Sequence, residues 1–283
     1  MYMPQSDRSR SDPRCSLSDP EDWELMAVEI DVKMHYALGG DPMVLLTIEA
    51  ARMAGQTVLH DQLEIEGATV TRIDGEGGVG QRVWARVDGA CLNLRYRASV
   101  ALSHPQRQIE TLDADSLPQL PGDVLASLRP SRYCQSDLFR DLAAQNFGDL
   151  AGGQKVLAIR DWVIGALRYA PGSSNAETSA VDTFTTGEGV CRDYAHMVCA
   201  LARASNIPAR YVSVYGAGVN PPDFHAVAQV WLEGGWHMVD ATGMSSGAEL
   251  VVIAAGRDAS DIAFMETQYM AEMISQSVSV QIG

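Results

Sequence analysis

The sequence predicts an α+β protein: an N-terminal β-sandwich, then a domain in which a cysteine-bearing helix packs on an antiparallel sheet. Two observations support this fold class. Residues 28–36 alternate apolar and polar side chains as a half-buried strand does, and similar short runs continue to about residue 102. From about residue 136 the apolar spacing becomes helical, and after residue 208 it returns to strand-like runs.

The composition indicates a folded, enzyme-sized chain rather than a disordered one. Of its 283 residues, 46% are hydrophobic and 20% are charged, and the net charge is −15. Nucleic-acid binding depends on clustered Lys and Arg, so this negative balance argues against a nucleic-acid partner. No run approaches the roughly 20 apolar residues of a membrane span, so no membrane partner is expected.

Cysteine usage favours a reducing, cytoplasmic location. The five cysteines are Cys15, Cys91, Cys134, Cys191 and Cys199. Their number is odd and they include no CxxC pair, so neither a disulfide framework nor a zinc site is indicated. The chain also lacks a calcium-loop pattern, and we expect no metal and no cofactor.

The chain divides into four segments. Residues 1–20 mix Arg, Asp, Ser and Pro without an apolar stretch, which predicts a flexible polar tail. We expect the β-sandwich over 21–118, a helical connector over 119–150 and the second domain over 151–283. The boundary between the β-sandwich and the helical connector rests on the prolines and glycine of residues 117–122.

Three helices are expected after that boundary. Ser136 is placed to cap the first, which ends near Gly148. The second carries apolar side chains on one face, at Val156, Ile159, Val163 and Leu167. The third begins after Gly189 and ends at residues 206–208.

Strand-like runs follow at 210–215, 224–232 and 236–240. If Glu233 and Gly234 form a two-residue hairpin loop, Asp240 lies diagonal to His225 on the same face of the sheet. A three-residue loop would put these two groups on opposite faces unless a bulge corrected the register.

The C-terminal part of the chain predicts shorter elements. We expect a strand at 250–254, a short helical segment near 269–273 and a terminal strand at 278–282.

Cys191, His225 and Asp240 together predict a catalytic triad. A cysteine in the first turn of a helix faces backbone N–H groups and the positive end of the helix dipole, which stabilise a thiolate. A histidine at a strand start and an aspartate at the end of the neighbouring strand supply a base and a group that orients it. Taken alone, Cys191 would be a small buried hydrophobe, and only the combination favours catalysis.

The motifs around these residues resemble the transglutaminase-like superfamily, whose papain-like core carries a cysteine triad on a helix and two neighbouring strands. The resemblance rests on residues 169–174, 189–196, 206–213, 222–226 and 236–243. It extends to bacterial members, some named as cysteine proteases, that have an N-terminal β domain. One departure is Ala241, where the family usually has proline.

The resemblance implies amide acyl transfer or hydrolysis on a protein or peptide substrate, through a thioester on Cys191. His225 would then move the proton and Asp240 would orient the ring. The backbone N–H of Cys191 is a candidate oxyanion donor. Candidates for the second donor or for substrate contacts are Tyr169, Ser173, Ser174, Asp193 and Tyr194.

Two other functions remain open at the level of sequence. A cysteine peptidase that transfers only to water would need the same residues. A binding or scaffolding module that kept the fold without activity is the other alternative. The N-terminal domain carries no readable motif, so substrate presentation and an interaction platform are both open for it.

Overall fold

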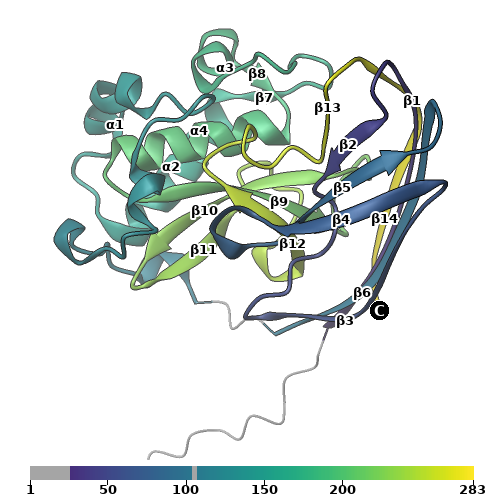
Figure 1. The fold of residues 1–283 in the computed structure, drawn as a ribbon. Helices are drawn as coiled ribbons and strands as arrows, with labels where there is room; N and C mark the ends of the chain where they lie inside the picture. Colours follow the sequence, from purple (N-terminus) through teal and green to yellow (C-terminus); the bar gives the residue numbers. More distant parts are fainter. Residues whose placement is uncertain (1–25, 104–106) are drawn as a thin grey trace, which may run out of the picture.

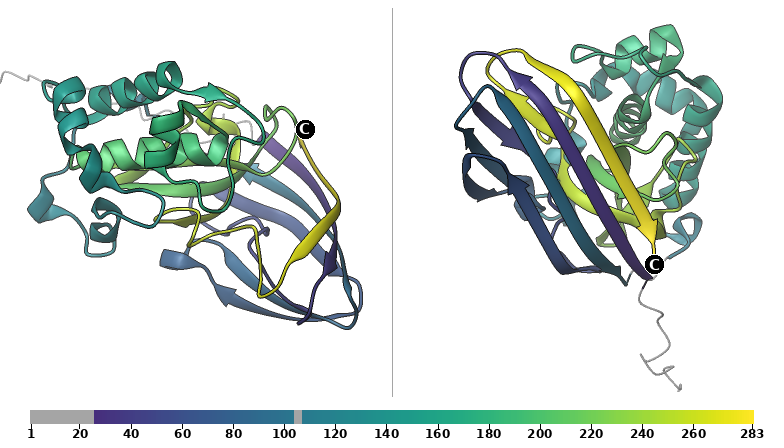
Figure 2. Two further views of the ribbon diagram at one scale, coloured as in Figure 1. Left: turned by 90° about the horizontal axis from the view of Figure 1, so that it is seen from above. Right: turned by 90° about the vertical axis from the view of Figure 1, so that its right-hand side faces the viewer.

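The computed structural model describes residues 26–103 and 107–283 as an α+β structure (Figure 1). The tail predicted for residues 1–20 lies outside these ranges. Two four-stranded sheets form a sandwich, and a third four-stranded sheet carries the helices (Figures 1 and 2). The predicted fold class is therefore confirmed.

The first sheet of the sandwich has the order β14-β1-β6-β3 and is antiparallel throughout. Its strands are β1 (Met26–Leu38), β3 (Gln56–Ile65), β6 (Cys91–Leu102) and β14 (Ala271–Ile282). Alternate residues of β1 face the core, as the sequence predicts.

Strand β14 differs from the sequence-based expectation in two ways. The sequence places it in the domain over 151–283, whereas it pairs with β1 and completes the sandwich. The helix predicted near 269–273 is also wrong, since the strand already begins at Ala271. The cause is a long-range one: backbone pairing with β1, more than 230 residues away, overrides the local pattern.

The second sheet of the sandwich has the order β13-β2-β5-β4. Its strands are β2 (Met43–Leu46), β4 (Ala68–Asp74), β5 (Gln81–Val87) and β13 (Met265–Thr267). Strand β4 lies at an edge and buries none of its residues, so it has no alternating apolar pattern for the sequence to reveal.

Direct contacts join the sandwich to the third sheet. The side-chain amide of Gln56 donates to the carbonyls of Ala51 (2.6 Å) and Val252 (2.9 Å), and its oxygen accepts the N–H of Val252 (2.7 Å). The Tyr215 hydroxyl donates to the Ile48 carbonyl at 2.6 Å. The apolar core of the sandwich also continues into residues of the third sheet, so the two parts pack as one body.

The third sheet has the order β11-β10-β9-β12. Its strands are β9 (Ala209–Gly216), β10 (His225–Leu232), β11 (Gly235–Val239) and β12 (Leu250–Gly256). Leu232 pairs with Gly235 across the turn, which confirms the predicted two-residue hairpin. Glu233 and Gly234 both have positive φ. A two-residue turn of this type matches the right-handed twist of the two strands that it joins.

In the described ranges the α-helices are α1 (Arg140–Phe147), α2 (Gly152–Ala166), α3 (Ala180–Thr186) and α4 (Cys191–Ala204). Helices α4 and α2 contact the third sheet, and α1 and α3 pack against α4. Helix α4 is central and packs on β10, with α2 beside it (Figure 1). Ser136 does not cap α1, because it is buried in a 3-10 turn that precedes this helix. In the described ranges, no helix has the length and apolar character needed to cross a membrane.

Candidate active site

Cys191 is the first residue of α4, directly after the short strand β8 (Glu188–Gly189). Glycine is needed at 189, because a Cβ there would come within 2.7 Å of the Cβ of Asp193. The Val190 N–H donates to Oδ2 of Asp193 at 2.9 Å, which closes the first helical turn. The partly exposed thiol therefore lies at the positive end of the helix dipole, as the sequence predicts.

His225 and Asp240 are in direct contact. His225 is the first residue of β10, and Asp240 directly follows the last residue of β11. Nε2 of His225 lies 3.1 Å from Oδ2 of Asp240, and the side chains are 0% and 4% exposed. The diagonal placement predicted from the hairpin register thus brings the two groups together.

The pKa values of this pair favour an imidazolium next to a carboxylate. Burial lowers the pKa of His225, but the hydrogen bond to Asp240 and the neighbouring Cys191 thiol outweigh it and raise the pKa to about 9. Burial raises the pKa of Asp240, but His225 and the Thr242 donors hold it below its usual range. The other ring nitrogen, Nδ1, is buried and has no hydrogen-bond partner within the described part of the chain.

Tyr169 is the candidate that lies beside the thiol. It ends strand β7 (Arg168–Tyr169), which pairs in parallel with β8 so that Tyr169 is opposite Gly189. Its phenol is close enough to Cys191 for the backbone N–H and the thiol of Cys191 both to affect the pKa of Tyr169. Burial and the charge of Cys191 raise the pKa of Tyr169 to about 12, so the hydroxyl keeps its proton at neutral pH.

Ser173 and Tyr194 do not point to the thiol. The Ser173 hydroxyl donates to the Ala170 carbonyl at 2.7 Å and closes a local turn. The Tyr194 hydroxyl donates to the buried Leu167 carbonyl at 2.9 Å, which ties α4 to the end of α2. Their hydrogen bonds indicate structural roles for both residues.

Asp193 and Ser174 are part of a hydrogen-bond network at the first turn of α4, which begins with Cys191. The Asp193 carboxylate is fully buried and accepts the Ser174 hydroxyl at 3.0 Å. Arg192, which the sequence reasoning did not single out, donates to the Ser174 hydroxyl (2.6 Å) and to the carbonyls of Asn175 (2.5 Å) and Thr178 (3.3 Å). This network holds the loop after Tyr169 against the first turn of α4.

Thr242 and Ser245 are further residues that the sequence reasoning missed. Oδ1 of Asp240 accepts the Thr242 N–H (2.7 Å) and hydroxyl (2.6 Å), and Oδ2 accepts the Ser245 hydroxyl (2.9 Å). An aspartate that accepts an N–H two residues later is an Asx turn, so the Asp-x-Thr spacing is a signal that could have identified Thr242. These donors fix the carboxylate that faces His225.

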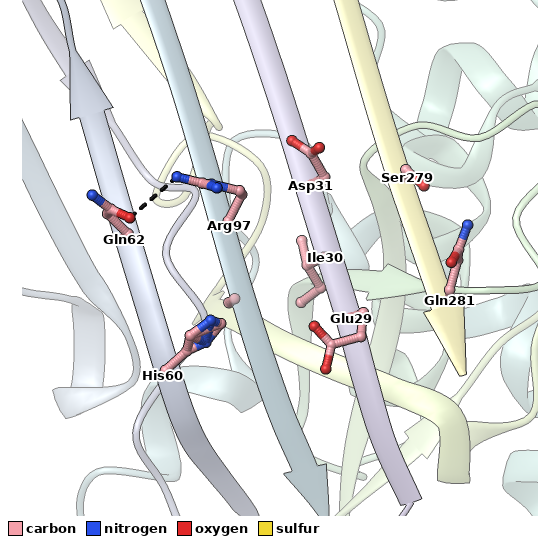
Figure 3. Close-up of a pocket in the computed structure, with 9 residues that line it drawn as sticks. Glu29, Ile30, Asp31, His60, Gln62, Arg97, Ser279 and Gln281 are labelled. Atoms are coloured by element: carbon pink, nitrogen blue, oxygen red, sulfur yellow. Dashed lines mark hydrogen bonds between the residues drawn. The ribbon is translucent and has the colours of Figure 1, made fainter. Parts of the chain in front are cut away.

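A separate polar hollow, whose lining does not include Cys191, lies on the outer face of the first sandwich sheet (Figure 3). Its side chains come from β1, β3, β6 and β14, and Arg97 donates to Gln62 across it at 3.2 Å. On the same face, Arg95 pairs with Asp31 at 2.7 Å. These cross-strand contacts are typical of the solvated face of an antiparallel sheet.

Comparison with curated proteins finds uncharacterised relatives in mycobacteria. One from Mycobacterium leprae (strain TN) is 30% identical over 123 residues, which covers 40% of this chain and 44% of that protein. One from Mycobacterium tuberculosis (strain ATCC 25618 / H37Rv) is 30% identical over 165 residues, covering 50% and 51%. The chain thus spans about half the length of the curated relatives it matches.

A family profile and a solved structure define the relationship further. Residues 141–241 match the profile described as the transglutaminase-like superfamily. The crystal structure of a "Putative Cysteine Protease" from Cytophaga hutchinsonii is similar, with a TM-score of 0.86 and 34% identity over 92% of this chain and 91% of that one. These matches support a cysteine-based enzyme family, and the chain belongs to the transglutaminase-like superfamily.

Proposed function

We propose that this chain is a cysteine-dependent amide hydrolase or acyltransferase that acts on protein or peptide substrates. The observation that carries the proposal is the position of His225, which contacts Asp240 through Nε2 and interacts with the thiol of Cys191. A base that is held by an orienting acid and lies beside a cysteine is the arrangement that activates the thiol for acyl transfer.

In the first half of the reaction, the Cys191 thiolate attacks the carbonyl carbon of the substrate amide. The His225 imidazolium gives its proton to the departing amine as the C–N bond breaks, which leaves a thioester on Cys191. In the second half, neutral His225 takes a proton from water or an amine, which attacks the thioester and releases the thiolate. Asp240 keeps the ring oriented and stabilises its charged form in each half.

Two donors beside the thiol would stabilise the oxyanion of each tetrahedral intermediate. One is the backbone N–H of Cys191, at the start of α4. The other is the Tyr169 hydroxyl, which retains its proton and adjoins that N–H. One such donor typically contributes about 3 kcal/mol to catalysis.

Activity profiling of the purified chain tests this function. Glutamine peptides and isopeptides would be incubated with and without a primary amine, and the products measured by mass spectrometry. We expect deamidation, cleavage or amine incorporation by the wild type and none by Cys191→Ala. Cys91→Ser, which changes an exposed cysteine in the sandwich, is the matched control and should retain activity.

The same experiment identifies whether water or an amine accepts the acyl group. Amine-dependent products indicate an acyltransferase, and products that form equally without amine indicate a hydrolase. If the wild type and Cys191→Ala are indistinguishable on every substrate, the proposed function is wrong and a non-catalytic binding module becomes the better account.

A further inference from the structure

Asp223 lies on the loop between β9 and β10, two residues before His225, and is exposed. Its Oδ1 accepts the Phe224 N–H at 2.8 Å and the side-chain amide of Gln276 at 2.9 Å. The oxygen of Gln276 in turn accepts the Tyr36 hydroxyl at 2.8 Å. Strands β1 and β14 of the sandwich therefore fix the orientation of a carboxylate next to the candidate active site.

The second carboxylate oxygen of Asp223, Oδ2, has neither a cationic partner nor a hydrogen-bond donor among the described residues. Across residues 26–103 and 107–283, no Lys, Arg or His forms an ion pair with Asp223. Among the described residues, both hydrogen bonds to Asp223 go to Oδ1, which leaves Oδ2 of this exposed side chain without a partner there.

The charge of Asp223 acts on the surroundings of the thiol. Burial, then the charge of Cys191 and also that of Asp223, raise the pKa of Tyr169. Burial and Asp223 together raise the pKa of Tyr36. Because the Tyr169 phenol adjoins Cys191, a group placed between Tyr169 and Asp223 would lie close to the reacting sulfur.

We propose that Asp223 is a specificity-determining residue that selects acyl-donor substrates with a cationic group, an ammonium or a guanidinium, next to the scissile amide. A fixed carboxylate with one free oxygen can bind such a group by a charge-assisted hydrogen bond. The net charge of −15 would add long-range attraction for a cationic substrate. This inference rests on the function proposed above.

The attraction of cationic groups to Cys191 by Asp223 can be tested without knowing the substrate. Two methanethiosulfonate reagents of similar size, one with a trimethylammonium group and one with a sulfonate, would be reacted with Cys191. Cys91→Ser would be present throughout to remove an exposed thiol, and Cys15→Ser to remove a thiol that lies outside the described residues. The readout is the ratio of the cationic to the anionic labelling rate.

Asp223→Asn is the informative variant, because asparagine keeps the Oδ1 acceptor for Phe224 and Gln276 and removes only the charge. We expect it to lower the rate ratio about fivefold or more. Asp115→Asn is the matched control: Asp115 also accepts a backbone N–H, that of Gly234 at 3.1 Å, but at the opposite end of β10. The control should leave the ratio unchanged, and an unchanged ratio in Asp223→Asn overturns the proposal.

Peptide turnover tests the selection itself. Peptides with lysine, arginine or norleucine next to the scissile amide would be compared in the wild type and in Asp223→Asn. We expect kcat/KM for lysine to exceed that for norleucine about tenfold in the wild type, and this preference to be lost in the variant. An active wild type without this preference contradicts the proposal. If the wild type turns over no peptide, the proposed function fails, and the labelling ratio alone decides whether Asp223 selects cations at Cys191.

Discussion

Nε2 of His225 lies 3.1 Å from Oδ2 of Asp240, although the two residues are 15 apart in the chain. The contact follows from the tight turn at Glu233 and Gly234, which sets the register of β10 against β11. The start of one strand and the end of the next are then neighbours. A one-residue slip would move Asp240 to the other face of the sheet and separate the pair.

Asp240→Asn tests the role of the carboxylate. Asparagine keeps one oxygen for the Thr242 donors, but its NH2 group takes the place of Oδ2, which accepts the Ser245 hydroxyl and faces His225. It therefore cannot stabilise a charged His225 to the same extent. We expect kcat/KM to fall about 100-fold, the lower end of what general acid–base catalysis contributes. Steady-state kinetics measure this, and circular dichroism would check that the variant is folded. A change of less than threefold would argue against the triad.

The pH profile of the wild type should show a high-pH limb that belongs to His225. The leaving amine needs the imidazolium, and the pKa of His225 is raised to about 9. kcat/KM should therefore decline as the pH rises through about 9, because the ring loses its proton there. In Asp240→Asn the same limb should move to lower pH, since the carboxylate that raises this pKa is absent. A limb at the same pH in both proteins would assign it to another group.

Tyr169→Phe tests the second oxyanion donor. Removing the hydroxyl should lower kcat about 100-fold or more with little change in KM, because the interaction is made in the transition state. Tyr194→Phe is the matched control: its hydroxyl bonds the Leu167 carbonyl, so its loss should cost about 1 kcal/mol of stability and leave kcat within about twofold. Equal effects of the two variants on kcat would remove Tyr169 from the mechanism.

Gln56→Leu tests the junction between the sandwich and the third sheet. The change leaves the N–H and carbonyl of Val252 and the carbonyl of Ala51 buried without these partners. We expect the free energy of unfolding to fall by about 2–4 kcal/mol in urea denaturation. Gln62→Leu, an exposed position on the same strand, should cost less than about 0.5 kcal/mol. Similar losses in both variants would mean that the Gln56 bonds do not support the junction.

The sequence predicted best where local rules decide the structure. Helix α4 begins where glycine gives way to an amphipathic pattern, so the position of Cys191 could be anticipated. The contact between His225 and Asp240 followed from one of the two loop lengths considered, the two-residue turn at Glu233 and Gly234, which the structure has. The position of Tyr169 could be offered only as one of five candidates. It depends on the pairing of β7 with β8, two residues each, which is too short to have a periodicity.

Long-range packing accounts for what the sequence did not reveal. The segment around 269–273 has local helical spacing, but its partner β1 is at the other end of the chain. Asp193 and Ser174 lie in the right motifs, yet which side chain turns inward depends on Arg192 and on the loop it holds. Tertiary contacts determine this strand pairing and these side-chain orientations, and the spacing of residues in the sequence does not indicate them.

The alkylation rate of Cys191 tests the central claim most directly. With Cys15 and Cys91 replaced by serine, iodoacetamide labelling at pH 6 would be compared between the wild type and His225→Ala. If His225 and the α4 terminus together stabilise the thiolate, the wild type should react at least about tenfold faster than the variant. Equal rates in the two proteins would show that the histidine does not activate the sulfur, and would contradict the account.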